Sequence, residues 1–426
     1  MGFAQLHCHH SSGSMLDSVV SSEELAKRAS ELGHKYLADT DHGRCSAWYD
    51  HNLACLKYGV KPIFGIEQYI VEDEGLMVMN DKGKRTRSKN NHIILLAKNQ
   101  TGMRNISHLL YISMADTDHF YYNNHNTFSE LFKYSEGIIC GTACMASPFA
   151  NALKEGREDK AESLFKTFLD VFKDNFYVEL QLNEMVHDIG ALKNGQKDIN
   201  DFLSSLADKY GVPKVITGDV HYLMPEDYKL QDISLAMREK RTVNEAGFTL
   251  ESRTLYYHDV PDYKAFNERF GYGLTDEQIE QYCSNAEYIA SRCDACIPER
   301  TKAIFPNVTN EDEYEMERLA KENLAAYCGV DDWQKAPEEY KERLESELNV
   351  LKAKGFGNYV MLLWDIFQFC SRENVPVGYA RGSGAGSLVL FLLGITKIDS
   401  LKNGLLFDRF LSQDRCVDCV VDYWNE

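Results

Sequence analysis

The chain has 426 residues, which is enough for two or three domains of ordinary size and for a substantial hydrophobic core. Hydrophobic residues make up 44% of it and charged residues 26%, and this composition excludes intrinsic disorder, collagen and a coiled coil. The 46 Lys and Arg residues are outnumbered by 65 Asp and Glu residues, and the formal net charge of −19 argues against generic electrostatic binding of DNA. A phosphate-bearing partner would have to be held by local cations or by bound metal ions.

The first residues lack the cationic start and the long apolar stretch of a secretion signal. The most apolar runs, residues 359–370 and 388–395, are too short to span a membrane, and the first of them contains Asp365. Twelve cysteines are too few for a disulfide scaffold in a chain of this length. We therefore expect a reduced, cytoplasmic, soluble protein with no membrane partner.

In chain order, the first two-thirds of the sequence alternates short apolar runs with helix-like stretches, the pattern of an α/β fold built from βα units. A helix is predicted after the first strand, because Ser21 and Glu24 form a capping box and Gly33 can end the helix. The predicted strands are residues 3–6, 36–38, 63–66, 93–96, 137–140, 177–182 and 214–217.

From about residue 275 the sequence changes to longer helical patterns. Residues 311–328 and 339–354 are charged and amphipathic, as surface helices are. We therefore divide the chain into two domains, residues 1–275 and 276–426, and expect the second to be mostly helical.

Potential metal ligands recur at the ends of the predicted strands. His7, His9 and Asp17 follow the first strand, Asp39 to His42 the second, Glu67 the third, Cys144 the fifth, and Asp219 and His221 the seventh, while His92 precedes the fourth. In parallel βα folds the connecting loops converge at one end of the strands, so these side chains can meet there.

Each of these histidines, taken alone, is more often a hydrogen-bonded loop residue than a metal ligand. Their recurrence beside carboxylates and a thiol is harder to explain in that way. Imidazole, carboxylate and thiolate ligands together favour Zn²⁺, Mn²⁺ or Fe ions. Two or three such ions can clamp a phosphodiester and supply a hydroxide near neutral pH, so the pattern predicts a multinuclear metal site.

Four segments carry a resemblance to a known family. Residues 6–9 (Leu-His-Cys-His), 40–43 (Thr-Asp-His-Gly), 61–67 (Lys-Pro-Ile-Phe-Gly-Ile-Glu) and 218–221 (Gly-Asp-Val-His) resemble the PHP (polymerase and histidinol phosphatase) domain. The resemblance implies a distorted barrel of seven βα units that binds three metal ions through nine residues. An intact ligand set goes with 3′→5′ exonuclease activity in this family, so the resemblance also implies DNA as a partner, at a primer 3′ end or in a single strand.

All nine positions of the family pattern are filled in this sequence. By resemblance, the first ion would be held by His7, His9, Glu67 and Asp219. Glu67 would bridge to the second ion, which His92 and Cys144 would also hold. The third ion would be held by Asp17, His42 and His221. These nine residues are the expected catalytic residues, and a metal-activated water would attack a 3′-terminal phosphodiester.

A glycine-rich segment, residues 377–387, leads into the apolar run 388–395. Backbone N–H groups left free in such a turn, together with the N-terminus of the following helix, can cradle phosphates. Arg381 would add a planar cation for phosphate oxygens. Alone, the pattern fits a close packing bend between helices equally well.

The surrounding segments favour the phosphate interpretation. Residues 340–344, 354–359, 381–389 and 406–411 resemble the palm of C-family DNA polymerases, the bacterial polymerase III alpha subunits and their phage relatives. The likeness runs in family order from about residue 3 to 415. By resemblance, the residues that grip the triphosphate of an incoming nucleotide are Arg381, Gly382, Ser383 and Arg409.

The resemblance fails at the palm carboxylates. The family places two aspartates on one strand face to bind two Mg²⁺ ions, and the candidates here are Asp418 and Asp422. In either alignment Val420 takes one of the two positions, and a valine cannot bind a metal ion. The remaining palm, thumb and fingers are also missing. We therefore expect no DNA synthesis by this chain alone, and we expect Mg²⁺ in the palm only if a second chain carrying the rest of the polymerase completes it.

A basic run precedes His92 and consists of Lys82, Lys84, Arg85, Arg87 and Lys89. Such a run is usually a solvated hairpin, but here it is also a candidate guide for a DNA backbone entering the metal site. Two other functions remain open for the whole chain. One is a free-standing phosphoesterase that acts on a small phosphate monoester, and the other is a non-catalytic scaffold subunit for a partner polymerase chain.

Overall fold

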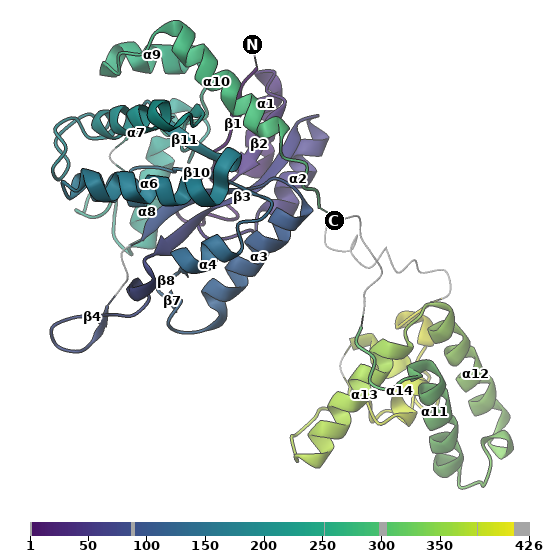
Figure 1. Cartoon of the computed structure of the whole chain (residues 1–426). Coiled ribbons are helices and arrows are strands. Elements are labelled where there is room, and N and C mark those ends of the chain that lie inside the picture. The colour runs from purple at the N-terminus through teal and green to yellow at the C-terminus, as the bar shows by residue number, and fades with distance from the viewer. Residues whose placement is uncertain (1, 87–89, 251, 298–304, 381, 413–426) are drawn as a thin grey trace. The chain divides into compact units, whose positions relative to one another are not determined.

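Figure 1 shows the computed structural model of the chain. The described residues are 2–86, 90–250, 252–297, 305–380 and 382–412. The chain divides into two units, Met1–Ile297 and Pro298–Glu426, each with a hydrophobic core of its own. Among the described residues, no helix is both long enough and apolar enough to cross a membrane.

The first unit is built on one curved sheet. Its main strands are β1 (Ala4–Gln5), β2 (Tyr36–Asp39), β3 (Lys61–Val71), β6 (Asn91–Ala97), β10 (Ile138–Gly141), β11 (Phe176–Gln181) and β12 (Lys214–Thr217), hydrogen-bonded in that order. Just beyond the two outer strands, Cys8 and Val220 form a parallel bridge, in which the N–H of Val220 donates to the carbonyl of His7 at 3.1 Å. This bridge nearly closes the sheet into a barrel, so the predicted α/β barrel with seven strands is confirmed.

The direction of β6 distorts the barrel. It runs antiparallel to both of its neighbours, β3 and β10, whereas the other neighbouring pairs along the sheet are parallel. As a consequence, the first residues of β6 lie at the same end of the barrel as the last residues of the other strands. In the register of β3 and β6, His92 pairs with Tyr69 and Ile94 pairs with Glu67.

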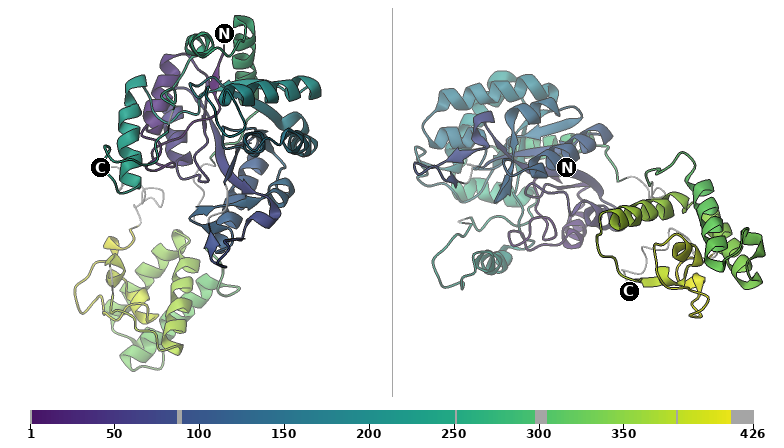
Figure 2. Two further views of the ribbon diagram at one scale, coloured as in Figure 1. Left: turned by 90° about the vertical axis from the view of Figure 1, so that its left-hand side faces the viewer. Right: turned by 90° about the horizontal axis from the view of Figure 1, so that it is seen from below.

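Helices pack around the outside of this sheet, as the views in Figures 1 and 2 show. They are α1 (Ser22–Glu31), α2 (Trp48–Lys57), α3 (Gln100–Ala115), α4 (Phe128–Lys133), α5 (Pro148–Lys154), α6 (Glu158–Phe172), α7 (Gln196–Tyr210), α8 (Tyr228–Arg238), α9 (Val260–Phe270) and α10 (Asp276–Ser291). The predicted capping box begins α1, because the Ser21 hydroxyl accepts from Glu24 N and the Glu24 carboxylate accepts from Ser21 N. Between α5, α6 and β11, a cluster of phenylalanines fills the core.

Short strands extend the connections of the barrel. The hairpin of β4 (Val78–Met79) and β5 (Arg85–Thr86) lies between β3 and β6 in the chain. A second small hairpin pairs β7 (Phe120–Tyr121) with β8 (Asn123–Asn124), and β9 (Asn126–Thr127) pairs in parallel with the end of β3. Of these short strands, only β9 pairs with β3, at Ile70 and Val71.

The structure places the division between the units after Ile297, not at residue 275 as the sequence suggested. The helix α10 was assigned to the second domain, but it packs on β1, β2 and β12 of the barrel. It buries Ile279, Cys283 and Ala286 in the core of the first unit. Its amphipathic pattern resembles that of the later helices, so the pattern alone did not show which core the helix would join.

The described part of the second unit is helical, with α11 (Asp312–Cys328), α12 (Glu338–Ala353), α13 (Gly357–Arg372) and α14 (Leu388–Leu392). Its core includes Leu324 of α11, Leu344 of α12 and Val389 of α14, all of them fully buried. A 3₁₀ turn, Gly382–Gly386, directly precedes α14 and packs against a second 3₁₀ turn, Phe407–Arg409.

Candidate metal centre

The nine side chains predicted as metal ligands lie together at one end of the barrel. Each has a ligand atom no farther than 3.5 Å from a ligand atom of another member of the set. They come from loops after β1, β2, β10 and β12, from within β3 and from the start of β6. The antiparallel direction of β6 explains why His92 reaches the site from the beginning of a strand.

Glu67 lies at the centre of the cluster and is fully buried. Its Oε1 is 3.0 Å from His92 Nδ1 and 3.4 Å from Cys144 Sγ. Its Oε2 is 2.7 Å from His42 Nδ1 and 3.7 Å from His9 Nε2. One carboxylate thus faces ligand atoms on both of its oxygens, which is the arrangement a bridging ligand needs.

The position of Glu67 in its strand differs from the prediction. The sequence suggested that the third strand ends at Ile66, but β3 continues through Glu67 to Val71. The reason is that β6 and β9 both pair with this later part of the strand and satisfy its backbone groups. The adjacent strand β2 stops earlier, so His42 forms a bridge pair with Glu67 at this level.

A second part of the cluster is centred on Asp219. Its Oδ1 lies 3.3 Å from His7 Nε2 and 3.2 Å from His9 Nε2. The backbone of Asp219 has a φ of +50°, in the left-handed region that aspartate tolerates better than most residues. His221 Nδ1 lies 2.8 Å from the backbone carbonyl of Asp219, and a proton donated there leaves Nε2 free to bind a ligand.

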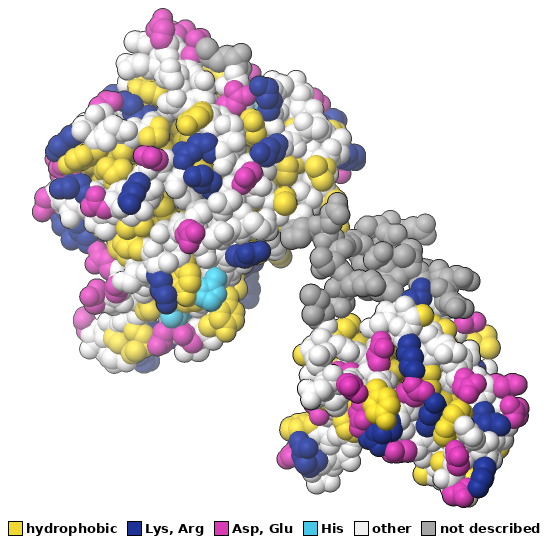
Figure 3. Space-filling model, turned by 45° about the vertical axis from the view of Figure 1, so that its right-hand side comes forward, with side chains coloured by type: hydrophobic (Ala, Val, Ile, Leu, Met, Phe, Trp, Pro, Cys, Tyr) yellow, Lys and Arg dark blue, Asp and Glu magenta, His cyan; other side chains and the backbone are white. Residues whose placement is uncertain are grey.

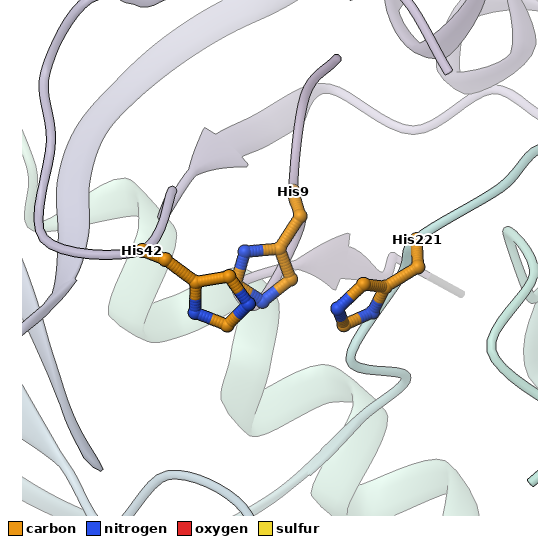
Figure 4. Close-up of side chains that lie close together, drawn as sticks. All are labelled: His9, His42 and His221. Atoms are coloured by element: carbon orange, nitrogen blue, oxygen red, sulfur yellow. The ribbon is translucent and has the colours of Figure 1, made fainter. Parts of the chain in front are cut away.

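Figure 4 shows how three of the imidazoles converge from three separate loops. The ring centroids of His9 and His42 are 4.1 Å apart, and those of His9 and His221 are 4.4 Å apart. Asp17 joins the group through His42, because its Oδ2 lies 3.1 Å from His42 Nε2. Its other oxygen lies 3.3 Å from a guanidinium nitrogen of Arg238.

Burial and mutual contact set the protonation of the cluster. Burial would raise the pKa of Glu67, but the imidazoles of His92 and His42 hold it well below its ordinary value. Burial would lower the pKa of His42, but Tyr69 and the Glu67 carboxylate raise it well above its ordinary value. Burial raises the pKa of the Cys144 thiol, and Glu67 raises it further. Cys144 would therefore act as a thiolate only where a cation takes the place of its proton.

The chemistry of the cluster fits divalent cations. Four of its buried ligand atoms make no hydrogen bond with the described residues, namely His7 Nε2, Asp17 Oδ1, His42 Nδ1 and Glu67 Oε2. Leaving such an atom unsatisfied costs about 1–3 kcal/mol, and a bound cation would satisfy it. Three groups have ligand atoms within 4.8 Å of one another, namely His7 with His9 and Asp219, His42 with Glu67 and His92, and His9 with His42 and His221.

Residues outside the predicted set hold the ligands in place. Glu179 of β11 is almost fully buried, and its Oε2 lies 2.9 Å from His7 Nδ1. The same carboxylate accepts hydrogen bonds from the Thr217 hydroxyl and from Ala143 N, each at 2.9 Å. Sequence reasoning missed Glu179, although a carboxylate in the middle of a mostly apolar predicted strand was a signal that could have found it.

A separate group of buried polar residues lies beside the cluster. It consists of His10, Asp39 and Asp41, whose side chains are all inaccessible to solvent. Burial raises the pKa of Asp39 to about 7 and that of Asp41 to about 8. Asp41 also accepts hydrogen bonds from His10 N and from the Ser14 hydroxyl, both at 2.7 Å, so it fixes the loop that carries His9.

The cluster borders a cavity of about 350 Å³. Its ligand-type lining residues are Asp17, His42, Glu67, His92, Cys144, Asp219 and His221. The rest of the lining includes Tyr69, Gln181, Asn183, Arg238, Phe248 and Leu250. The candidate ligands are thus accessible from a space large enough for a small organic group.

The described part of the basic run, Lys82, Lys84 and Arg85, belongs to a hairpin, as the sequence suggested. Lys82 and Lys84 are exposed at the turn between β4 and β5. Arg85 is held by Asp118, with its guanidinium 4.7 Å from the ring centroid of Tyr121. Arg87 and Lys89 lie outside the described residues, and DNA contact by this hairpin stays a prediction. On the face drawn in Figure 3, Lys and Arg side chains are interspersed with Asp and Glu.

The helix that follows the glycine-rich segment of the second unit was expected to begin with free backbone N–H groups, and the structure differs. The N–H groups at the start of α14 are not free, because Leu388 N and Val389 N donate to the buried carboxylate of Glu347 at 2.9 and 3.0 Å. Leu390 N donates to the Ser387 hydroxyl. The start of this helix therefore offers no binding site for a phosphate.

The described candidate nucleotide-binding residues lie on both sides of α14 in the chain and are accessible. Gly382, Ser383 and Arg409 are exposed, and the two turns that carry them pack together. Arg343 fixes this region, because its guanidinium donates to the carbonyls of Gly386 and Leu405 at 2.7 and 3.0 Å. Arg381, Asp418 and Asp422 lie outside the described residues, so the triphosphate grip and the palm carboxylates stay predictions.

Comparison with known proteins finds a matching protein family model for each of the two units. The family model of the PHP domain matches residues 5–183, and that of the bacterial DNA polymerase III alpha NTPase domain matches residues 314–422. The DNA polymerase III subunit alpha of Aquifex aeolicus is 32% identical over 440 residues, which cover 100% of this chain and 36% of that protein. The corresponding subunit of Chlamydia pneumoniae is 31% identical over 460 residues, covering 97% of this chain and 36% of that protein.

The chain thus spans about a third of the length of these curated relatives, which is 36% in both cases. A solved amidohydrolase from Chromobacterium violaceum aligns with 51% of this chain and 87% of its own, at 13% identity and a TM-score of 0.33, a likeness too weak to build on. The sequence relatives and the two family models agree with each other along the chain. The chain belongs to the bacterial DNA polymerase III alpha family, with a PHP domain in its first unit and the family's NTPase domain in its second.

Proposed function

We propose that the first unit is a metal-dependent phosphodiesterase that removes nucleotides from the 3′ end of DNA, within a replicative polymerase of the DNA polymerase III alpha type. The observation that supports this most strongly is the meeting of nine ligand-type side chains around Glu67 and Asp219 at the edge of a cavity. The family membership of the chain supports DNA as the substrate.

The proposed ligand sets are those that the family resemblance implies. His7, His9, Glu67 and Asp219 would hold one ion, Glu67, His92 and Cys144 the second, and Asp17, His42 and His221 the third. Zn²⁺, Mn²⁺ and Fe suit this mixture of nitrogen, oxygen and sulfur ligands. When bound, such ions supply a hydroxide nucleophile near neutral pH and neutralise charge on phosphate oxygens.

The residues of the chain itself orient these ligands. A proton on His7 Nδ1, directed at Glu179, keeps Nε2 free on the side of Glu67 and Asp219. The Ser14 hydroxyl, 3.2 Å from His9 Nδ1, does the same for His9. The antiparallel strand β6 fixes His92 beside Glu67 without a flexible loop. The site is therefore preorganised for cation binding before any substrate arrives.

We propose further that the second unit contributes part of a nucleotidyl-transfer palm, with Gly382, Ser383, Arg381 and Arg409 on the triphosphate. It would act only together with a further segment or chain that carries the remaining catalytic carboxylates and the fingers. The chain covers only 36% of each of these two relatives, which is consistent with a palm that is shared with a further segment or chain.

The test is an exonuclease assay of the purified chain on 5′-labelled single-stranded DNA and on a primer with a mismatched 3′ end. Shortening from the 3′ end is expected with Mn²⁺ or Zn²⁺, and its loss after chelation is expected to reverse when metal is restored. His9→Ala and Asp219→Asn should abolish it. His108→Ala, at an exposed position on α3, is the control for the loss of an imidazole.

Activity that survives both substitutions would show a contaminating nuclease and would contradict the proposal. Hydrolysis of mononucleotides to nucleosides without any shortening of DNA would favour the alternative of a small-molecule phosphoesterase. A chain that binds no metal under any condition would favour the scaffold alternative.

A further inference from the structure

Part of the wall of the cavity beside the metal centre is formed by side chains that are not proposed metal ligands. It contains a guanidinium from Arg238, an aromatic ring from Phe248 and a primary amide from Gln181. We propose that these three side chains form a nucleotide subsite, in which Arg238 binds a phosphate, Phe248 stacks on the base and Gln181 donates a hydrogen bond. This inference rests on the proposed function, because it assumes a phosphodiester substrate at the metal centre.

Arg238 is positioned between the metal centre and the aromatic ring. It occupies the last turn of α8, and one of its terminal nitrogens lies 3.3 Å from Asp17 Oδ1. The carbon at the centre of its guanidinium lies 5.4 Å from the ring centroid of Phe248. It is the one Lys or Arg among the described residues that line this cavity. A guanidinium offers five N–H donors in a plane, so the contact with Asp17 leaves donors for phosphate oxygens.

Phe248 is a half-exposed aromatic residue on a firmly held loop. Phe248 is 49% exposed, so part of its ring is accessible to a ligand even with Arg238 nearby. The backbone is fixed on both sides, since Phe248 N donates to Glu239 at 2.9 Å and Arg241 donates to the Phe248 carbonyl at 2.6 Å. Arg241 also donates to Glu239 at 2.7 Å and so closes the loop. A ring held in this way can receive a base without first being ordered.

Gln181 independently supports a ligand-binding role for the cavity. It is the last residue of β11 and is 3% exposed, and its side-chain Nε2 makes no hydrogen bond with the described residues. A buried amide donor without an acceptor is destabilising, so such a group is expected to have a partner in the working state. A phosphate or sugar oxygen of a bound nucleotide would supply the acceptor.

The dimensions of the cavity agree with a single nucleotide. Its volume of about 350 Å³ lies at the lower end of the range for small-ligand sites. Leu250 and Leu255 also line it, so the wall contains apolar side chains in addition to the Phe248 ring. The wall therefore offers an apolar part for a base and a cationic part for a phosphate, within one space.

The experiment measures binding by isothermal titration calorimetry on the full chain with Mn²⁺, using dAMP as one probe and 2-deoxyribose 5-phosphate, which lacks the base, as the other. Phe248→Leu should weaken dAMP binding by about tenfold and leave 2-deoxyribose 5-phosphate unchanged, because one base-stacking contact is lost. Arg238→Gln should weaken both probes. Gln181→Leu should weaken at least dAMP, by roughly fivefold.

The chain offers closely matched controls. Arg253 is 38% exposed and pairs with Asp232 at 2.8 Å, as Arg238, at 37%, pairs with Asp17. Its guanidinium also lies 4.7 Å from the ring centroid of Tyr228, yet it does not line the cavity. Arg253→Gln should leave both affinities unchanged. Phe120→Leu removes a ring that is 47% exposed elsewhere on the first unit, and it should also have no effect.

The outcomes separate this inference from the proposed function. Binding of dAMP that depends on Phe248, in a chain without exonuclease activity, would support the subsite and contradict the proposed reaction. The subsite would be overturned, and the proposed reaction would stand, if the chain has exonuclease activity but Phe248→Leu and Arg238→Gln leave its affinity for dAMP unchanged. The subsite is also overturned if the parent chain binds neither probe, or binds both equally well. The metal content of Arg238→Gln, measured alongside, shows whether its effect comes through Asp17.

Discussion

Glu67 Oε2 and His42 Nδ1 lie 2.7 Å apart, in full burial, yet no hydrogen bond of ordinary geometry joins them. Both atoms are candidate metal ligands, and neither has a hydrogen-bond partner among the described residues. Glu67 comes from the middle of β3 and His42 from the loop after β2, so adjacent strands of the barrel fix their spacing. Within the described part of the chain, this unsatisfied pair supports the assignment of the cluster as a metal site.

Replacing Glu67 with Gln should reduce metal content and activity together. The substitution removes the charge that faces His92 and His42, and an amide is a much poorer metal ligand. We expect at least one metal ion fewer per chain and a fall in exonuclease rate of about 100-fold or more. Metal analysis by mass spectrometry and a rate measurement check this. Glu226→Gln, on an exposed turn, should change neither quantity.

Glu179→Gln tests the support behind the ligands. The carboxylate accepts from three donors, and a glutamine amide would place its own N–H group against one of them. Metal affinity should fall by roughly 10- to 100-fold, as it does when outer residues of metal sites are changed. Competition with a chelator measures the affinity. An unchanged affinity would show that His7 needs no orienting partner.

Glu347→Leu should destabilise the second unit and leave the first unit intact. The buried carboxylate accepts from Arg343, from the Ser387 hydroxyl and from the start of α14, so its loss leaves a partly buried guanidinium and several backbone donors without a partner. A loss of about 3–5 kcal/mol is expected in urea denaturation followed by Trp fluorescence. Glu345→Gln, an exposed neighbour on α12, should have almost no effect.

His258 predicts a pH dependence of the stability of the first unit. Burial lowers the pKa of its imidazole from 6.5 to about 3, and neither ring nitrogen has a hydrogen-bond partner among the described residues. In the unfolded chain the His258 imidazole is protonated below about pH 6.5, whereas in the folded chain it is protonated only below about pH 3. Stability should fall as the pH drops through this window, by about 2 to 3 kcal/mol at two units below 6.5.

The variant His258→Phe checks the assignment. The ring is surrounded by Tyr256, Tyr263 and Phe266, so a phenyl group suits the site. This variant should lose that share of the acid sensitivity while keeping its stability at pH 8. Denaturation curves between pH 8 and pH 4 provide the measurement, and an unchanged slope would contradict the prediction.

The purified chain should show no primer extension with Mg²⁺ and all four deoxynucleoside triphosphates. The resemblance to the family puts Val420 in the position of a metal-binding aspartate, and two-metal catalysis needs both carboxylates. Incorporation of a labelled nucleotide, followed on a gel, is the measurement. Extension that appears only after a second polypeptide with the missing carboxylates is added would identify that polypeptide as the partner.

Most of the barrel could be predicted from the sequence because each strand is a short apolar run between polar loops. The direction of β6 could not, because an apolar run reads the same in either direction. Glu67 was expected just after a strand, because a charged residue in a buried strand resembles a strand end. The capping of α14 by Glu347 could not be predicted either, because the two are about 40 positions apart in the chain and meet only in the folded core.

The candidate ligands were predictable for a related reason, since they recur at fixed places relative to strands. The wall formed by Arg238, Phe248 and Gln181 lacks such a signal. Arg238 is the last residue of the helix α8 and Phe248 lies in a loop without apolar periodicity, so only the tertiary fold brings them beside Gln181. The residue composition of α10 likewise did not indicate which of the two cores this helix packs into.

The seam between the first and last strands has a consequence for how the barrel forms. His9 and Asp219 are 210 positions apart in the chain, whereas β3 and β6 are neighbours joined by a local hairpin. Contacts between distant segments carry the larger loop-closure entropy and tend to form late in folding. Cations that bind across this seam would act as a clasp, so their binding free energy would also resist the reopening of the barrel.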